Sequence, residues 1–266
     1  MPETWRLIQT PAAPGAQNMA LDQALLEAIA SSQGPPTLRL YTWDPPCLSL
    51  GHAQPTADID LNRLTALGWD WVRRPTGGRA ILHTHELTYA VVLPADHPLV
   101  GGGVLDAYRR LSQGLATALL DLGVPVEIHR TPAAAADRAN PVCFEVFSVY
   151  ELTVQGRKLV GSAQVRRGGG VLQHGSLPLT GDVSRICQAL RYPDEEARAA
   201  AAARLQQRAA TLEACLGRQP TWEEVAQAVV GGFARALRLE LVPGECTAEE
   251  AERMQSLVLK RYAQPA

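Results

Sequence analysis

The sequence predicts an α+β fold in which a mixed, largely antiparallel sheet is flanked by helices. Three observations lead to this class. The predicted elements follow the order strands, helix, strands, helices. The middle of the chain alternates short apolar strands with glycine turns, the pattern of an antiparallel meander. The last third carries helix signals instead. We expect one domain over residues 1–266, with its core at about 18–240 and C-terminal helices over 221–264.

The N-terminal elements are a helix and two strands. Apolar residues at helical spacing from Met19 to Ile29 predict a helix with Asn18 as its N-cap. The alternating stretch Thr37–Trp43 predicts a strand that the prolines after it bring to an end. The stretch WDWVRRPTGGRAIL, residues 69–82, predicts a strand that runs into a glycine turn. Leu87–Pro94 is expected to be a further buried strand.

A helix and a meander follow. Leucines and a tyrosine at helical spacing between Leu105 and Leu122 predict a helix that stops at Gly123. The segments YELTV and RKLVGSAQV are joined at Gln155-Gly156, which is a hairpin signal. The glycines of RRGGG, residues 166–170, turn the chain again into VLQHGSLPL.

The C-terminal third is expected to be helical. The alanine-rich run Ala197–Ala203 suits a helix. Thr221 with Glu224, and Thr247 with Glu250, have the spacing of a capping box, which marks the start of a helix.

Composition excludes several functional classes. The formal charge is −2, the pI is near 6.3 and no block of like charge is present, so we expect neither a nucleic-acid partner nor a membrane surface. The N-terminus has no secretion-signal pattern, and no apolar run approaches 18 residues. The cysteines are odd in number and form no CxxC, which favours neither a disulfide framework nor a zinc site. They are Cys47, Cys143, Cys187, Cys215 and Cys246. We therefore expect a cytoplasmic protein.

The stretch RRPTGGRAILH, residues 73–83, is a candidate binding loop. Adjacent glycines let the backbone approach a ligand closely, and the arginines around them could hold an anion. A tight turn with solvated arginines explains the same residues, because a lone Gly-Gly pair is weak evidence.

Cys143 and Lys158 form a candidate catalytic pair. Of the 25 lysines and arginines only Lys158 and Lys260 are lysine, so an amine at position 158 is unusual for this chain. Lys158 lies on the hairpin that follows Cys143, and an ammonium close to a thiol favours the thiolate. Lysine can also exchange a proton near neutrality when it is desolvated. The alternatives are a cysteine that fills the core and a lysine solvated at the turn.

The histidines offer less. His83 and His85 would face one side of a strand, and His174 lies on another strand. A metal site would need a third ligand, and no motif supplies one, so we expect no metal. A histidine base for Cys143 is conceivable on chemical grounds, but no spacing supports it.

Five motifs together resemble the lipoate/biotin protein ligase superfamily. In order they are NMALDQALLEA, LRLYTWDPPCLSLGHAQ, RRPTGGRAILH, ELTYAVV and GRKLVGSAQVRRGGGVLQHGSLPL, and they run from Asn18 to Leu179. Within the superfamily the chain most resembles the octanoyltransferases of the LipM type. The distinguishing feature is VCFE followed by YELTVQGRK, which places a cysteine and a lysine where these enzymes have them.

This resemblance implies a catalytic domain with a biotin/lipoate protein ligase (class II synthetase-like) fold that transfers an octanoyl group. It assigns the nucleophile role to Cys143, which would form a thioester with the acyl group, and the thiolate-stabilising role to Lys158. The donor would be octanoyl-acyl carrier protein. The acceptor would be a lysine of a lipoyl domain, such as the glycine cleavage H protein or the E2 subunit of a 2-oxoacid dehydrogenase. No cofactor is implied. We also expect substrate-binding roles for Arg73, Thr76, Gly77, Gly78, Arg79, His83, Gly161, Ser162, Ala163, His174 and Gly175. Of these, Thr76–Arg79 and Gly161–Ala163 would form the wall of an apolar tunnel.

Two departures and three alternatives accompany the resemblance. Phe147-Ser148 stands where these enzymes usually have Pro-Ser, and Thr84 stands where an aspartate is common. An ATP-dependent lipoate or octanoate ligase would share the lysine but does not need Cys143. An amidotransferase that moves octanoate between lipoyl domains also uses a cysteine and is harder to distinguish. A non-catalytic acyl-domain-binding protein would leave Cys143 buried and far from Lys158.

Overall fold

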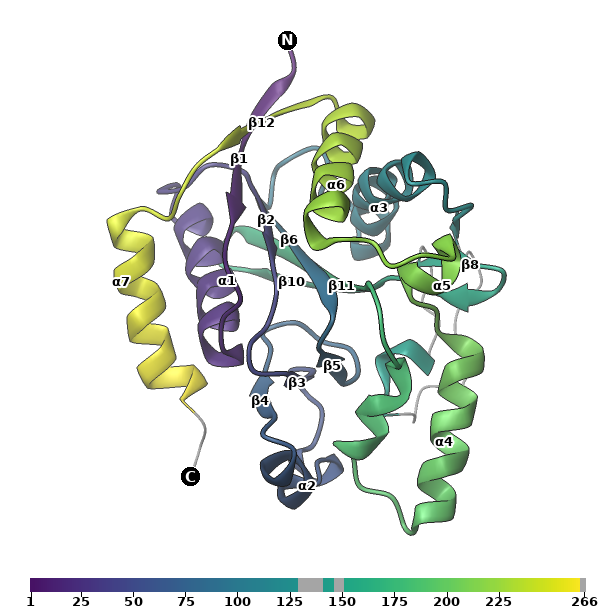
Figure 1. Cartoon of the computed structure of the whole chain (residues 1–266). Coiled ribbons are helices and arrows are strands. Elements are labelled where there is room, and N and C mark those ends of the chain that lie inside the picture. Colours follow the sequence, from purple (N-terminus) through teal and green to yellow (C-terminus); the bar gives the residue numbers. More distant parts are fainter. Residues whose placement is uncertain (129–140, 146–150, 264–266) are drawn as a thin grey trace.

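A six-stranded mixed sheet forms the centre of the molecule (Figure 1). The computed structural model describes residues 1–128, 141–145 and 151–263. The strand order is β10-β11-β6-β2-β1-β12. The strands are β1 Glu3–Gln9, β2 Thr37–Tyr41, β6 Glu86–Pro94, β10 Gly161–Arg167, β11 Gly170–Pro178 and β12 Leu239–Pro243. Strands β10, β11, β6 and β2 pair antiparallel, whereas β1 pairs parallel with both β2 and β12. The predicted α+β class and mixed sheet are confirmed.

Strand β6 shows why the sheet needs helices on both faces. All of its residues except the last are buried, and successive side chains point to opposite faces. Tyr89 and Val91 belong to the core under α3 (Val104–Asp121) and α6 (Trp222–Leu237). Ala90 and Val92 belong to the core under α1 (Gly15–Ala30) and α7 (Ala248–Leu257). Figure 1 shows these two helix pairs on opposite sides of the sheet.

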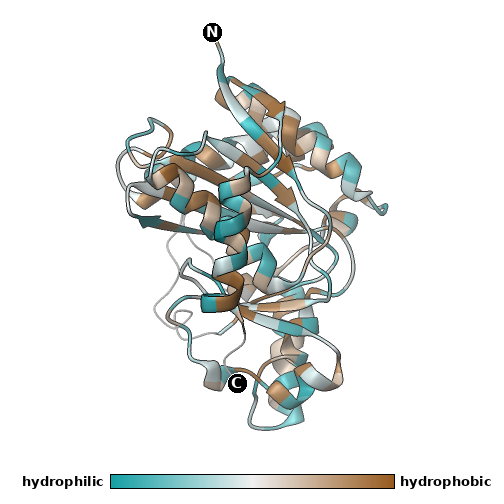
Figure 2. Ribbon diagram, turned by 90° about the vertical axis from the view of Figure 1, so that its left-hand side faces the viewer, coloured by the Kyte–Doolittle hydropathy of each residue, from teal (hydrophilic) through white to brown (hydrophobic). Residues whose placement is uncertain are grey.

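Hydropathy follows the same division. In Figure 2 hydrophobic residues are frequent along the central strands, while the outer helices alternate hydrophobic and hydrophilic residues along their length. The remaining helices are α2 Leu61–Ala66, α4 Glu195–Arg208 and α5 Leu212–Leu216, with short helical turns at Thr56–Asp58, Cys143–Glu145, Val183–Gln188 and Val258–Tyr262. No helix in the described part of the chain is long and apolar enough to cross a lipid bilayer.

Two smaller sheets carry the segments that matter for the site. One has the order β4-β3-β5, and the other has the order β7-β8-β9. Their strands are β3 Cys47–Leu50, β4 Asp70–Arg73, β5 Ile81–His83, β7 Glu127–Ile128, β8 Leu152–Val154 and β9 Arg157–Lys158. Between β4 and β5 lies the glycine turn that the sequence predicted, which we call the glycine loop, residues 74–80.

The hairpin predicted at Gln155-Gly156 is confirmed. Thr153 pairs with Lys158 across β8 and β9. Both turn residues have positive φ, 51° for Gln155 and 73° for Gly156, as a two-residue hairpin turn of type I′ requires. The expectation of one continuous meander was wrong, however. The strand breaks at Leu159-Val160, so β8 and β9 belong to the small sheet, while β10 and β11 join the large one.

Helix boundaries were predicted unevenly. Helix α3 ends just before Gly123, whose φ is +84°, and Thr247 with Glu250 forms the predicted capping box of α7. Thr221 caps α6 through its hydroxyl group, which accepts a hydrogen bond from the backbone N–H of Glu224. Asn18 is not a cap, because α1 begins earlier, after Pro14. Its side chain is instead buried against the carbonyls of Ala13 and Thr42.

The C-terminal region is not purely helical. Strand β12 lies between α6 and α7 and pairs with β1, and neither strand was predicted from the sequence. The last residues of the expected helical stretch, from Gln264 onward, lie outside the described residues.

Candidate active site

Cys143 is held against the glycine loop by backbone hydrogen bonds. The N–H of Ala80 donates to the carbonyl of Pro141 at 2.9 Å, and the N–H of Cys143 donates back to the carbonyl of Ala80 at 3.0 Å. Cys143 then opens a 3₁₀ turn and is partly buried, with a free thiol. Its own N–H is therefore already engaged in a backbone hydrogen bond.

Lys158 reaches Cys143 from β9. Its Nζ lies 3.6 Å from the Cys143 sulfur and 3.0 Å from the Cys143 carbonyl oxygen. The side chain is 1% exposed, so the alternative of a solvated turn lysine is excluded. Nζ also lies 5.5 Å from the centre of the Phe144 ring, within range of a cation–π contact.

Glu151 is a member of this cluster that the sequence reasoning missed. Its Oε1 accepts a hydrogen bond from Lys158 Nζ at 2.6 Å, and both side chains are buried. Glu151 and Thr153 are two residues apart and share one face of the chain, and Thr153 is the strand partner of Lys158. The predicted hairpin register could therefore have indicated this pair.

The ion pair keeps Lys158 charged. Burial alone would lower the pKa of Lys158, but the neighbouring Cys143 and Glu151 outweigh it and raise that pKa above its ordinary value. Lys158 is consequently an ammonium at neutral pH. In the resting protein it supplies positive charge and N–H donors and does not act as a base.

A narrow pocket of about 30 Å³ lies beside the Cys143 sulfur. Its lining residues come from α1, the large sheet, the small β4-β3-β5 sheet and the glycine loop, and they are Met19, Tyr41, Trp43, Ser49, Arg74, Gly78, Ile81, His83, Thr88, Cys143, Gly161, Ser162, Ala163, His174, Gly175 and Ser176. This volume holds little more than one water molecule. The predicted tunnel is thus narrow, and an acyl chain has to displace side chains in order to enter.

Two glycines of the pocket wall, Gly161 and Gly175, have different roles. A Cβ on Gly161 would lie 3.4 Å from the Cys143 sulfur and 3.5 Å from Lys158 Cε. A Cβ on Gly175 would lie 2.6 Å from the Gly161 carbonyl and 2.6 Å from the Tyr89 ring, which leaves no room for it. Gly175 is therefore needed for strand packing, whereas Gly161 leaves space at the nucleophile.

The predicted substrate-binding residues divide into two groups. Gly78, His83, Gly161, Ser162, Ala163, His174 and Gly175 line the Cys143 pocket. Arg73, Thr76, Gly77 and Arg79 do not line it. Thr76 is buried behind the wall, and Gly77 is exposed at the loop surface.

Arg73 lies outside the lining of the Cys143 pocket. Its guanidinium donates to backbone carbonyls, including those of Gly51 and His52 at 3.0 and 3.2 Å. Arg74 lines the pocket instead and is 3% exposed. Side chains along β4 alternate in direction, so the two neighbouring arginines face opposite ways, and the repeated Arg-Arg in the sequence could not distinguish them.

Arg74 holds the glycine loop in place. Its five N–H groups are all engaged, with contacts between 2.7 and 3.2 Å. The acceptors are the Thr76 hydroxyl, the Ser49 carbonyl and hydroxyl, and the carbonyls of Gly77 and Arg79. Arg74 is thus a structural part of the pocket wall, with no N–H left over for a substrate.

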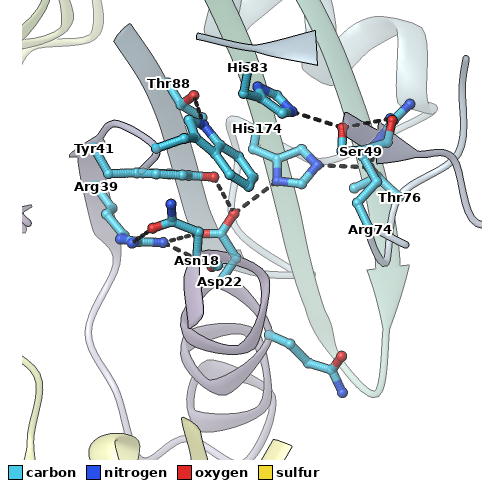
Figure 3. Close-up of polar contacts among 12 residues, drawn as sticks. Asn18, Asp22, Arg39, Tyr41, Ser49, Arg74, Thr76, His83, Thr88 and His174 are labelled. Atoms are coloured by element: carbon cyan, nitrogen blue, oxygen red, sulfur yellow. Dashed lines mark hydrogen bonds and ion pairs between the residues drawn. The ribbon is translucent and has the colours of Figure 1, made fainter. Parts of the chain in front are cut away.

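Two buried histidines contact the same hydroxyl groups that Arg74 contacts, His174 at Thr76 and His83 at Ser49 (Figure 3). His174 Nε2 lies 2.7 Å from the Thr76 hydroxyl, and its Nδ1 lies 2.8 Å from the carboxylate of Asp22. Burial lowers the pKa of His174, although Asp22 opposes this effect. A neutral His174 therefore donates from Nδ1 to Asp22 and accepts the Thr76 hydroxyl proton at Nε2.

The second histidine is His83, which also lines the pocket. His83 Nε2 lies 2.8 Å from the Ser49 hydroxyl, and its Nδ1 lies 2.7 Å from Glu86. Its ring stacks on Trp43 with the ring centres 4.0 Å apart. Each histidine is thus fixed between a hydroxyl group and a carboxylate. In the described part of the chain the hydrogen bonds of both rings go to these hydroxyl groups and carboxylates and not to Cys143, which does not favour a Cys–His pair.

The remaining expectations concern His85, a metal site and the two departures from the family pattern. His85 does not share a face with His83, because β5 ends at His83 and His85 lies exposed in the following turn. In the described ranges no three His, Cys, Asp or Glu side chains gather in a way that could hold a metal ion. Thr84 lies partly exposed in that same turn, and Phe147 and Ser148 lie outside the described residues.

Residues 14–234 match the family described as the lipoyl protein ligase A/B catalytic domain. Among known proteins, the octanoyltransferase LipM of Symbiobacterium thermophilum is 43% identical over 267 residues, covering 98% of this chain and 97% of that protein. The octanoyltransferase LipM of Moorella thermoacetica is 43% identical over 263 residues, covering 98% and 96%. That of Kyrpidia tusciae is 41% identical over 266 residues, covering 98% and 97%.

Solved structures show the same fold at lower identity. A crystal structure of lipoate-protein ligase A bound with ATP has a TM-score of 0.79 at 23% identity, covering 100% of this chain and 97% of that one. The bipartite lipoate protein ligase of Thermoplasma acidophilum has a TM-score of 0.78 at 23% identity, covering 99% and 94%. These similarities show that the overall fold is shared.

Proposed function

Because this chain belongs to the lipoyl protein ligase A/B catalytic domain family, we propose that it is an octanoyltransferase that carries the acyl group on Cys143. The full-length relatives that are octanoyltransferases support the reaction type. The observation that carries the mechanism is the position of the Lys158 ammonium, 3.6 Å from the Cys143 sulfur in a buried site.

The first half-reaction is an exchange between a thiol and a thioester. The Cys143 thiolate attacks the carbonyl carbon of an octanoyl thioester, the new C–S bond forms and the donor thiol leaves. The proton lost by Cys143 ends on the departing thiol, so the exchange is nearly thermoneutral and consumes no ATP. We take octanoyl-acyl carrier protein as the donor. Lys158 stabilises the thiolate before attack by its charge.

The second half-reaction forms an amide. The ε-amine of a lysine on a lipoyl domain attacks the acyl carbonyl, and Cys143 leaves as the thiolate. The acceptor ammonium releases one proton to solvent, and a second proton moves to the sulfur as the amide forms. An N–H group of Lys158 can donate a hydrogen bond to the leaving sulfur, because Nζ lies 3.6 Å from that sulfur in the resting structure.

We place the acyl chain along the pocket beside Cys143. From Gly161 on β10 it crosses β11 and β6 to Tyr41 on β2, over three strand spacings of about 4.8 Å each. An extended eight-carbon chain measures roughly 9 Å and fits this path once the side chains separate. Its burial contributes about 0.8 kcal/mol per CH₂. We place the reaction in the cytoplasm, where a cysteine stays reduced.

A transfer assay without ATP tests this proposal. The purified protein is incubated with octanoyl-acyl carrier protein and an unmodified lipoyl domain, and the lipoyl domain is followed by mass spectrometry. Octanoylation in the absence of ATP is the expected result. Modification from free octanoate only when ATP is added would instead indicate a ligase. A parallel reaction with an octanoylated lipoyl domain as donor separates transfer from the carrier protein from amidotransfer.

A further inference from the structure

We propose that Glu151 is a positioning residue of the active site, the permanent counter-ion that keeps Lys158 an ammonium through both half-reactions. This inference rests on the proposed function. It adds a third residue to the Cys143–Lys158 pair, one that acts through the lysine and does not touch the substrate.

The geometry shows why a counter-ion is needed. Lys158 is 1% exposed and its partner Glu151 is 5% exposed. A buried ammonium without an anion loses its proton, because burial disfavours the charged form. Glu151 Oε1 lies 2.6 Å from Nζ and supplies that anion.

Cys143 cannot replace Glu151 over the whole cycle. A thiolate balances Lys158 only until the sulfur is acylated, since the sulfur of a thioester is neutral. From then on Glu151 is the carboxylate that holds the charge on Lys158. The ammonium is needed at this stage, when the thiolate leaves as the amide forms.

Glu151 also opposes the thiolate in the resting protein. The Glu151 carboxylate and a Cys143 thiolate share one ammonium, so the two negative charges repel each other. Within the described residues, Arg74 and Tyr108 also lie within electrostatic reach of Cys143. Replacing Glu151 by glutamine leaves these groups unchanged and removes one negative charge, so the two half-reactions should respond in opposite directions.

The first test measures iodoacetamide alkylation of Cys143 against pH in Glu151→Gln, read from the mass of the Cys143 peptide. We expect the midpoint to move to lower pH, because the thiolate no longer competes with a carboxylate. This readout needs no octanoyl donor, so it reports on Glu151 even if the proposed function fails. An unchanged alkylation profile would overturn the proposal.

The second test separates the half-reactions in the same variant. Octanoyl-enzyme should form at a rate equal to or above that of the wild type, whereas its transfer to the lipoyl domain should slow about tenfold or more. Octanoyl-enzyme then accumulates during turnover. Equal slowing of both steps would indicate a merely structural residue and would also overturn the proposal.

Two controls complete the design. Glu151→Asp keeps the charge and should restore the wild-type alkylation profile. Glu127→Gln makes the same chemical change at an exposed position on β7, in the same small sheet, and should leave both half-reactions unchanged.

Discussion

At the scale of single residues, the identity of the cation at position 158 matters because the site is closed. Lys158 packs against Phe144 and Glu151 with almost no solvent contact. A guanidinium is larger and planar, and it spreads its charge over a fork of donors. Placing it there would force Cys143 or Glu151 to move.

Lys158→Arg should therefore slow formation of the octanoyl-enzyme by about 10²-fold or more, even though positive charge is retained. The measurement is the rate of mass gain on mixing with the octanoyl donor. Lys260→Arg serves as the control, because Lys260 is exposed near the C-terminus and its replacement should have no effect. Full activity of Lys158→Arg would mean that the site needs only a positive charge.

Single residues were easier to predict from the sequence where a residue type is rare in the chain than where the same residue type is repeated. The unusual lysine and the partner cysteine are placed together, as the pairing hypothesis requires. Arg73 was chosen over Arg74 because the sequence does not show which of two neighbouring arginines faces inward. Glu151 was overlooked because its contact with Lys158 depends on which residues of the hairpin pair with each other.

At the scale of elements, the strand pair β10–β11 combines two glycines with different tasks. Gly161→Ala should cover the Cys143 sulfur, since the new methyl group lies in van der Waals contact with it. We expect slower acyl-enzyme formation and little change in the free energy of unfolding. Gly175→Ala should instead destabilise the protein by about 1–3 kcal/mol through overpacking.

Urea unfolding and the acylation rate, measured on both glycine variants, check this division. Acylation should fall in Gly161→Ala at nearly unchanged stability, whereas stability should fall in Gly175→Ala. The opposite pattern would show that the strand pair has been assigned wrongly.

His174, which connects the glycine loop to α1, should make the stability of the protein depend on pH. The pKa of His174 is lowered in the folded protein, so the unfolded chain binds a proton that the folded chain does not. Stability should therefore fall as the pH drops through the ordinary histidine value of about 6.5. The contribution is at most about 1.4 kcal/mol per pH unit.

The test is to measure the free energy of unfolding of the wild type and of His174→Gln. The pH range is from about 8 to about 5.5, which spans the ordinary histidine pKa. Over this range the wild type should lose more stability than the variant does. Equal pH dependence in both proteins would show that His174 does not contribute.

Elements with strong local signals were predicted well. The β8–β9 hairpin, α3 and the cap of α7 each carry turn or cap residues at fixed spacing. Strands β1 and β12 were missed because they pair across the whole length of the chain, and no local pattern marks a parallel pairing of that kind. The break between β9 and β10 was missed for a similar reason, since Leu159 and Val160 continue the apolar run.

At the scale of the whole molecule, the chain combines a family fold with a local change in chemistry. The similarity to lipoate ligase structures extends over nearly the whole chain, and in this chain the sheet and the glycine loop contribute residues to the pocket. What points to acyl transfer is a small set of residues: Cys143 against the glycine loop and Lys158 on the hairpin. That residues 1–266 form one catalytic domain remains a prediction.

The most direct test of the account is the intact mass of the protein after incubation with octanoyl-acyl carrier protein, without ATP. The wild type should gain one octanoyl group, and the adduct should be removed by hydroxylamine, as expected for a thioester. Cys143→Ser should gain at most a base-stable ester, and Cys143→Ala should gain nothing. Normal acylation of Cys143→Ala would contradict the central claim that Cys143 carries the acyl group.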